Sequence, residues 1–88
     1  IGANPAKMGR CVVRFFAPTA ESRYTLKVYD ASGSVVRTLV DTKVKSAGWQ
    51  TVVWDTRDAR GHSIAAGIYF YRLESEGQSL TQKVVLVQ

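Results

Sequence analysis

The sequence contains few of the residues from which active sites and metal centres are usually built. Its 88 residues include one cysteine, one histidine and two prolines. The lone Cys11 excludes an internal disulfide, and no spacing of Cys and His residues matches a metal site. No glycine-rich phosphate loop is present, and His62 lies in a glycine-flanked turn rather than at a rigid strand end. We therefore predict no catalytic residues, no metal ligands and no cofactor.

Long apolar runs and clusters of charge are also missing. No segment approaches the roughly 20 apolar residues of a membrane-spanning helix, so membrane insertion is not expected. The 12 lysines and arginines outnumber the 7 acidic residues and give a net charge of +5. Because these cations are spread one or two to a segment, the sequence favours a solvated surface over a nucleic-acid site, with a small anion-binding patch as the alternative.

The chain is long enough for one domain, and its pattern is that of β-structure. Apolar residues alternate with polar ones in period two between short turns that are rich in Gly, Asp and Ser. We predict an all-β, Ig-like or fibronectin-III-like antiparallel β-sandwich of about seven strands over residues 10–88. Residues 1–9, IGANPAKMG, lack this alternation and are expected to be a linker from a preceding domain.

The alternation also predicts which side chains form the core. Trp54 is expected to pack against Tyr69 or Tyr71, while Leu80, Val84 and Leu86 of the last strand face inward. The inward positions of the first two apolar segments are Cys11, Val13, Phe15, Ala17, Tyr24, Leu26 and Val28. The large side chains left on outer faces are candidates for an exposed contact surface, namely Phe16, Trp49, Val53 and Phe70.

The acidic turn after Trp54 is the strongest candidate for a ligand-binding site. Asp55 and Asp58 supply carboxylate oxygens of the kind that calcium prefers. Arg57 and Arg60 alternate with them and neutralise the charge that a divalent cation would need, and a third acidic ligand is missing. We therefore favour a structural turn, in which both carboxylates accept hydrogen bonds from backbone N–H groups, and keep calcium as the alternative.

Several blocks of the sequence resemble a known family. They are NP at residues 4–5, VRF at 13–15, LKVYDASGSVVRTL at 26–39, GWQTVVWDTRDARGHSIAAGIYFYRL at 48–73 and KVVLV at 83–87. The chain resembles the Ig-like C-terminal modules of bacterial secreted proteins. These are related to the Ig-like part of the flagellar hook-capping protein and to type A sorting domains of the type IX secretion system. It departs from the pattern at Thr56, where Gly is common, at Gln50, where His is common, and at Gln88, where the chain stops without a basic residue.

The resemblance implies a scaffold role for the Trp54–Ser75 block and a non-catalytic function. We expect a C-terminal module of a larger secreted bacterial protein that serves as a sorting signal or as a cell-surface anchoring spacer. Its partners would be the upstream domain of the same polypeptide and secretion machinery or a cell-surface component. The alternative is a carbohydrate- or protein-binding module attached to an extracellular enzyme. A terminal strand can be read by strand addition, and the residues concerned are Lys83, Val84, Val85, Leu86, Val87 and Gln88.

Overall fold

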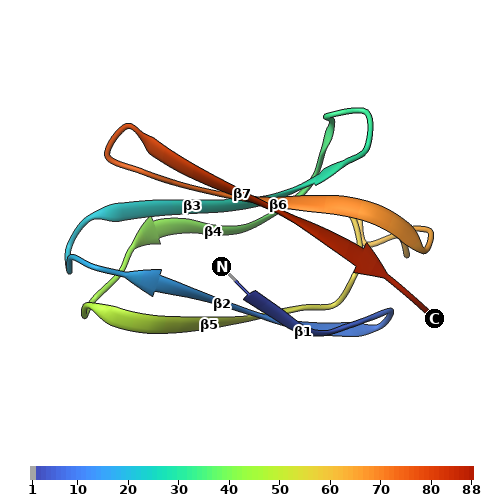
Figure 1. Ribbon diagram of the computed structural model, residues 1–88, viewed down its shortest axis with the longest axis horizontal. Helices are drawn as coiled ribbons and strands as arrows, with labels where there is room; N and C mark the ends of the chain where they lie inside the picture. Colours follow the sequence, from blue (N-terminus) through green and yellow to red (C-terminus); the bar gives the residue numbers. More distant parts are fainter. Residues whose placement is uncertain (1) are drawn as a thin grey trace.

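Two antiparallel sheets pack face to face in the computed structural model, which describes the backbone of residues 2–88 and the side chains from residue 7 onward (Figure 1). The strands in this part of the chain are β1 (Gly2–Lys7), β2 (Arg10–Ala17), β3 (Arg23–Asp30), β4 (Val35–Lys43), β5 (Gly48–Trp54), β6 (Gly67–Ser75) and β7 (Gln78–Leu86). One sheet has the order β1-β2-β5 and the other has the order β4-β3-β6-β7. The predicted all-β sandwich is confirmed. No helix among these residues is long and apolar enough to cross a lipid bilayer.

The first strand is the main difference from the sequence prediction. Gly2–Lys7 pairs antiparallel with β2, with Ala3 opposite Val13 and Lys7 opposite Arg10. This stretch, expected to be a linker, is therefore part of the three-stranded sheet. It carries no period-two signal because it is made of small residues and Pro5, and the register shifts between Ala3 and Ala6 around the proline, which has no N–H to donate.

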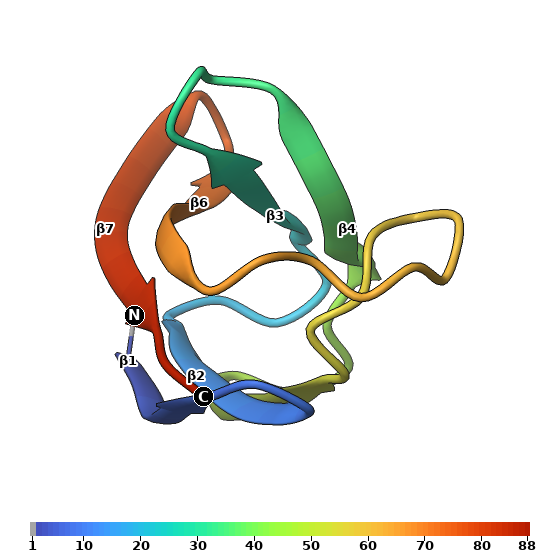
Figure 2. The ribbon, with the colours of Figure 1, turned by 90° about the vertical axis from the view of Figure 1, so that its right-hand side faces the viewer.

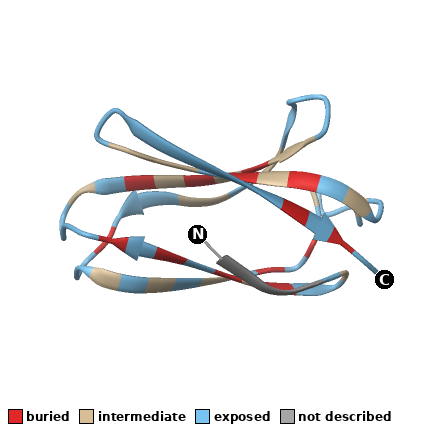
Figure 3. Ribbon diagram, viewed as in Figure 1, coloured by how far each residue is buried: buried red, intermediate tan, exposed pale blue. Residues whose placement is uncertain are grey.

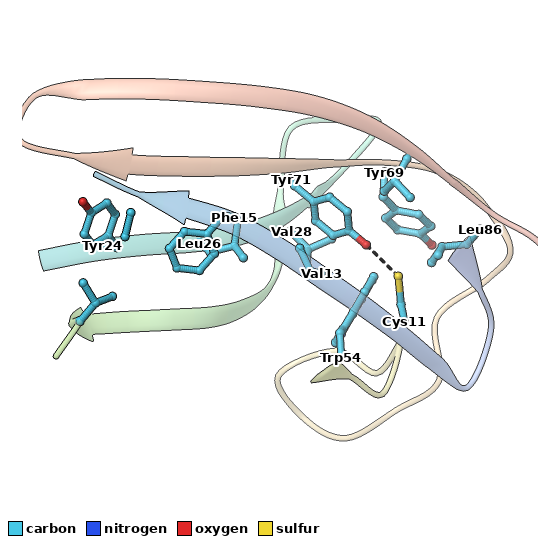
Figure 4. Packing of buried hydrophobic residues seen from close by; sticks show 13 residues of the cluster. Cys11, Val13, Phe15, Tyr24, Leu26, Val28, Trp54, Tyr69, Tyr71 and Leu86 are labelled. Carbon is cyan, nitrogen blue, oxygen red and sulfur yellow. Dashed lines mark hydrogen bonds between the residues drawn. The ribbon is translucent and has the colours of Figure 1, made fainter. Parts of the chain in front are cut away.

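The core lies between the two sheets and follows the predicted alternation (Figure 3). Its buried apolar residues are Cys11, Val13, Phe15, Ala17, Tyr24, Leu26, Val28, Val44, Trp54, Tyr69, Tyr71, Val84 and Leu86. Trp54 meets Tyr71 edge to face, with 6.3 Å between the ring centroids, which confirms the predicted contact. The hydroxyl of Tyr71 lies 3.1 Å from the Cys11 sulfur, so the one cysteine is a buried hydrogen-bond partner (Figure 4).

Contacts between the two sheets differ at the two lateral edges of the sandwich (Figure 2). On one side, the loop between β5 and β6 lies beside β4, and the backbone N–H of Ala59 donates to the carbonyl of Val36 at 3.1 Å. On the opposite side, the N–H of Met8 donates to the carbonyl of Val87 at 2.9 Å just beyond the ends of β1 and β7, next to a parallel bridge between Lys7 and Val87. The remainder of the outer edge of β7 pairs with no other strand in the described part of the chain.

Candidate functional site

The acidic turn that follows Trp54 is a hydrogen-bonded scaffold. Asp55 Oδ1 accepts from the backbone N–H of Arg57 at 3.0 Å and from the guanidinium of Arg37 at 2.9 Å. The indole N–H of Trp54 donates to the Arg57 carbonyl at 3.0 Å, so the core tryptophan also holds the loop. The N–H of Arg57, followed by the Arg37 guanidinium, holds the pKa of Asp55 below its ordinary value.

The second carboxylate of the turn is used in the same way. Asp58 Oδ1 accepts from the backbone N–H groups of Arg60 at 2.9 Å and His62 at 3.0 Å, and these bonds, the one from His62 first, lower its pKa. The imidazole of His62 is three-quarters exposed, and its Nδ1 lies 3.9 Å from Asp58 Oδ2. The prediction that both carboxylates order the turn is confirmed. Between residues 2 and 88, no group of three or more His, Cys, Asp and Glu side chains is placed to hold a metal ion.

Thr56 is a residue whose role the sequence alone did not reveal. Its side chain is 2% exposed, and its φ of 59° is in the left-handed region, where a β-branched residue is strained. The hydroxyl accepts from the N–H of Gly9 and donates to the carbonyl of Asp55, both at 2.7 Å. The only sequence signal was the departure from the glycine that the family resemblance favours. Thr56 links the β1–β2 turn to the end of β5.

The outer edge of β7 presents free backbone groups in a regular pattern. Ser75 pairs with Gln78 across a two-residue turn in which Glu76 and Gly77 both have positive φ, as a type I′ hairpin requires. The residues that flank such a turn exchange hydrogen bonds, so even-numbered residues of β7 bond to β6 and odd-numbered residues point away from it. Val87 is odd-numbered, and its carbonyl accepts the N–H of Met8 at the outer edge, which agrees with this alternation. The other odd-numbered residues, whose backbone N–H and C=O groups point away from β6, are Ser79, Thr81, Lys83 and Val85.

The side chains at the end of the chain alternate between the core and the solvent. Val84 and Leu86 are buried as predicted and belong to the core, while Lys83, Val85, Val87 and Gln88 are exposed. Leu80 was also predicted to face inward. It has the same parity on β7 as the buried Val84 and Leu86, but its side chain is 53% exposed, so it does not belong to the core as expected. It lines a hollow together with Phe16, Tyr24 and Leu73 at the end of the sandwich where β1 does not cover β7. Alternation sets the side to which Leu80 points but not whether another strand covers it.

The outer surface of the three-stranded sheet gathers most of the candidate contact residues. We call it the aromatic face and define it by the outward residues of β2 and β5, which pair across the sheet as Val12 with Val53, Arg14 with Thr51 and Phe16 with Trp49. Phe16 is 50% exposed, Trp49 62% and Val53 53%. Phe70, the fourth candidate, lies instead on β6 of the opposite sheet and is half-buried. The predicted contact surface is therefore three residues on one face and one on another.

A protein-family model, the FlgD Ig-like domain, matches residues 6–79 of this chain. The chain belongs to the FlgD Ig-like domain family. The match includes the Trp54 turn, β6 and the aromatic face, and it ends at Ser79. Most of β7 and the tail therefore lie beyond the residues that the family model describes. No curated protein sequence matches the chain.

Two solved structures share the fold of this FlgD Ig-like domain. The crystal structure of FlgD from P. aeruginosa matches with a TM-score of 0.68 and 23% identity over 86% of this chain. PorZ of Porphyromonas gingivalis matches with a TM-score of 0.55 and 15% identity over 88% of this chain, and is described as an essential bacterial surface component of the type-IX secretion system. The domain spans 60% of the FlgD chain and 11% of the PorZ chain. At identities of 23% and 15%, the similarity to these two structures shows a shared fold.

Proposed function

We propose that this FlgD Ig-like domain is a sorting or surface-anchoring module of a larger secreted bacterial protein, and that partners recognise it by strand addition along β7. The observation that carries the proposal is the outer edge of β7, where Ser79, Thr81, Lys83 and Val85 direct backbone N–H and C=O groups away from β6. An added strand would satisfy these groups, as in other cases of β-augmentation.

The dimensions of the edge suit such a partner. From Ser79 to Val85 the strand spans seven residues, or about 20–24 Å at the usual rise of a β-strand, which is the length of a typical strand. The hydrogen bond between Met8 and Val87 ends the free stretch on its C-terminal side. A partner strand would run between β7 and β1, with the hollow at Leu80 open to one of its side chains.

The comparisons support a location outside the cell. One structural relative, PorZ, is described as a bacterial surface component of a secretion system, and an Ig-like fold with no membrane-crossing helix among residues 2–88 is compatible with that setting. The partners that we propose are the upstream domain of the same polypeptide and a component of the secretion machinery or of the cell surface.

The test is a fusion of residues 1–88 to the C-terminus of a periplasmic reporter in a host with a type IX system. The matched variants are Thr81→Pro and Thr81→Val. Proline removes the outward N–H of an exposed edge residue without breaking a bond to β6, whereas valine keeps that N–H. We expect surface delivery with the wild type and with Thr81→Val, and its loss with Thr81→Pro, while all three proteins keep the same melting temperature.

Two outcomes would contradict the proposal. If the intact fusion stays in the periplasm, the sorting role is wrong. If Thr81→Pro is delivered as well as Thr81→Val, the edge of β7 is not what the machinery recognises. Deleting Gln88 alone separates the tail from the edge, because the terminal carboxylate that Val87 then carries can still accept the N–H of Met8.

A second candidate function, a binding module attached to an extracellular enzyme, is favoured by the exposed aromatic face. The Phe16 and Trp49 rings of this face are better arranged to bind a protein than a sugar. Phe16 and Trp49 meet at 71°, so they do not form the flat platform on which successive sugar rings stack.

A further inference from the structure

The acidic residues of this domain are distributed unevenly between its two sheets. All seven lie outside β1, β2 and β5, at Glu21, Asp30, Asp41, Asp55, Asp58, Glu74 and Glu76. The strands of the three-stranded sheet carry only the cations Lys7, Arg10 and Arg14. The surface that exposes the aromatic residues is therefore also the surface without negative charge.

Arg14 is the cation at the centre of this surface. Its guanidinium carbon lies 5.3 Å from the centroid of the Trp49 ring, and Phe16 meets the same ring edge to face at 5.5 Å. Among the described side chains, Arg14 forms no ion pair with a carboxylate. Stacking on Trp49 orients the planar guanidinium while leaving its N–H groups available to a carboxylate.

The outer surface of the opposite sheet is different. There Arg72, which pairs with Lys27 across the sheet, has its own acidic partner, since its Nε lies 3.3 Å from Glu74 Oε1. A cation that is already paired has less to gain from an incoming carboxylate than one that is not. The contrast with Arg72, together with the Trp49 ring that orients its guanidinium, makes Arg14 the arginine suited to bind a carboxylate.

Charge and composition together select one kind of occupant. A second copy of the domain that docked by its own aromatic face would bring a second Arg14 and no carboxylate into the interface, which leaves the like charges uncompensated. A nucleic acid needs several cations along its phosphates, whereas four of the six residues in the three cross-strand pairs of this face are apolar, Arg14 is the only cation among them, and Arg10 and Lys7 lie at the end of the sheet away from Trp49. An aromatic pair beside an arginine is the composition of a protein-binding hot spot.

We infer that the aromatic face binds a protein segment in which an aspartate or glutamate is flanked by apolar side chains. The carboxylate pairs with the Arg14 guanidinium, and the apolar side chains cover Trp49, Phe16 and Val53. This binding surface lies on the sheet that does not contain β7, and although Phe16 also borders the hollow at Leu80, the Thr81 variants that test the sorting role leave Arg14 and Trp49 unchanged.

The inference is tested with a phage-displayed library of random 12-residue peptides, selected on the immobilised domain. We expect enriched peptides to contain Asp or Glu beside apolar residues and to bind more weakly at high salt. Trp49→Ser and Arg14→Ala should each weaken binding by about 30-fold, the loss typical of a hot-spot residue. Arg14→Lys should weaken it less than Arg14→Ala, because it keeps the charge but loses the planar fork.

The matched control is the double variant Ile68→Ser, Arg72→Ala, which removes an exposed apolar residue and a cation from the opposite sheet. It should bind the peptides as the wild type does, and all variants should keep the wild-type melting temperature. The inference is wrong if no peptide is enriched, if enriched peptides lack acidic residues, or if Trp49→Ser binds them equally well. Trp49-dependent binding of a 20-residue oligothymidine without peptide binding would assign the face to nucleic acid, and Trp49-dependent dimerisation in sedimentation velocity would assign it to a second copy.

Discussion

Substitutions of Thr56 separate two opposing effects that the structure places on one buried residue. The hydroxyl bonds to the N–H of Gly9 and to the carbonyl of Asp55, which stabilises the domain, whereas its φ of 59° destabilises it. Serine keeps the hydroxyl, alanine removes it but keeps a Cβ in the left-handed region, and glycine removes both the hydroxyl and the strain. The series therefore measures each effect by difference.

The magnitudes follow from the geometry. Thr56→Ala leaves the partly buried N–H of Gly9 without its partner, which should lower the free energy of unfolding by about 1–2 kcal/mol. Thr56→Gly loses the same bonds, yet a Cβ in the left-handed conformation costs about 1–2 kcal/mol, so it should be about 1 kcal/mol more stable than Thr56→Ala. Thr56→Ser should lie within about 0.5 kcal/mol of the wild type.

Urea denaturation followed by tryptophan fluorescence measures these differences, and a loss of about 1–2 kcal/mol should lower the midpoint by about 1 M. Thr51→Ala, an exposed threonine on β5, is the control and should leave the midpoint unchanged. The reasoning about the hydroxyl is refuted if Thr56→Ala is as stable as the wild type. The reasoning about strain is refuted if glycine at this position is no more stable than alanine.

Three further predictions concern the core and the acidic turn. In urea denaturation, Trp54→Ala should lower the free energy of unfolding by about 3–5 kcal/mol, because the Trp54 ring is fully buried. Trp49→Ala should lower it by less than about 0.5 kcal/mol, because the Trp49 ring is exposed. Equal effects of the two substitutions would contradict the core assignment. Burial, and then the bond to Cys11, raise the pKa of Tyr71 above its ordinary value, so the fold favours the neutral phenol. The stabilisation that the neutral phenol gives is present below pH about 10 and is lost as the pH rises further. The urea midpoint should therefore fall between pH about 9 and 11, and Tyr71→Phe should flatten this fall. An unchanged slope in Tyr71→Phe would contradict the prediction. Calcium should leave the melting temperature unchanged, because Asp55 and Asp58 already accept hydrogen bonds within the turn, and a rise that EDTA reverses would overturn the structural-turn interpretation.

The sequence by itself determined the class of fold and the side of the sheet on which most strand residues lie. Period two is a local property, since successive side chains of a strand point to opposite faces whatever the strand pairs with. The alternation therefore placed Trp54 and Tyr71 inside and Trp49 outside without knowledge of the partner strands. The turn at Asp58 was equally local, because its carboxylate binds N–H groups two and four residues further along the chain.

Only the tertiary structure decided which surfaces are covered, because covering depends on strands that are distant in sequence. Gly2–Lys7 is a strand because β2 offers it an edge, not because its residues alternate. Leu80 is on the inner side of β7 but is exposed, since it lines a hollow with Phe16 and Tyr24 instead of packing in the core. Thr56 tolerates a left-handed backbone because Gly9, 47 residues away, supplies a hydrogen bond to its hydroxyl. The stacking of Arg14 on Trp49 likewise required the register between β2 and β5, which is set by the packing of the whole sandwich and not by either strand alone.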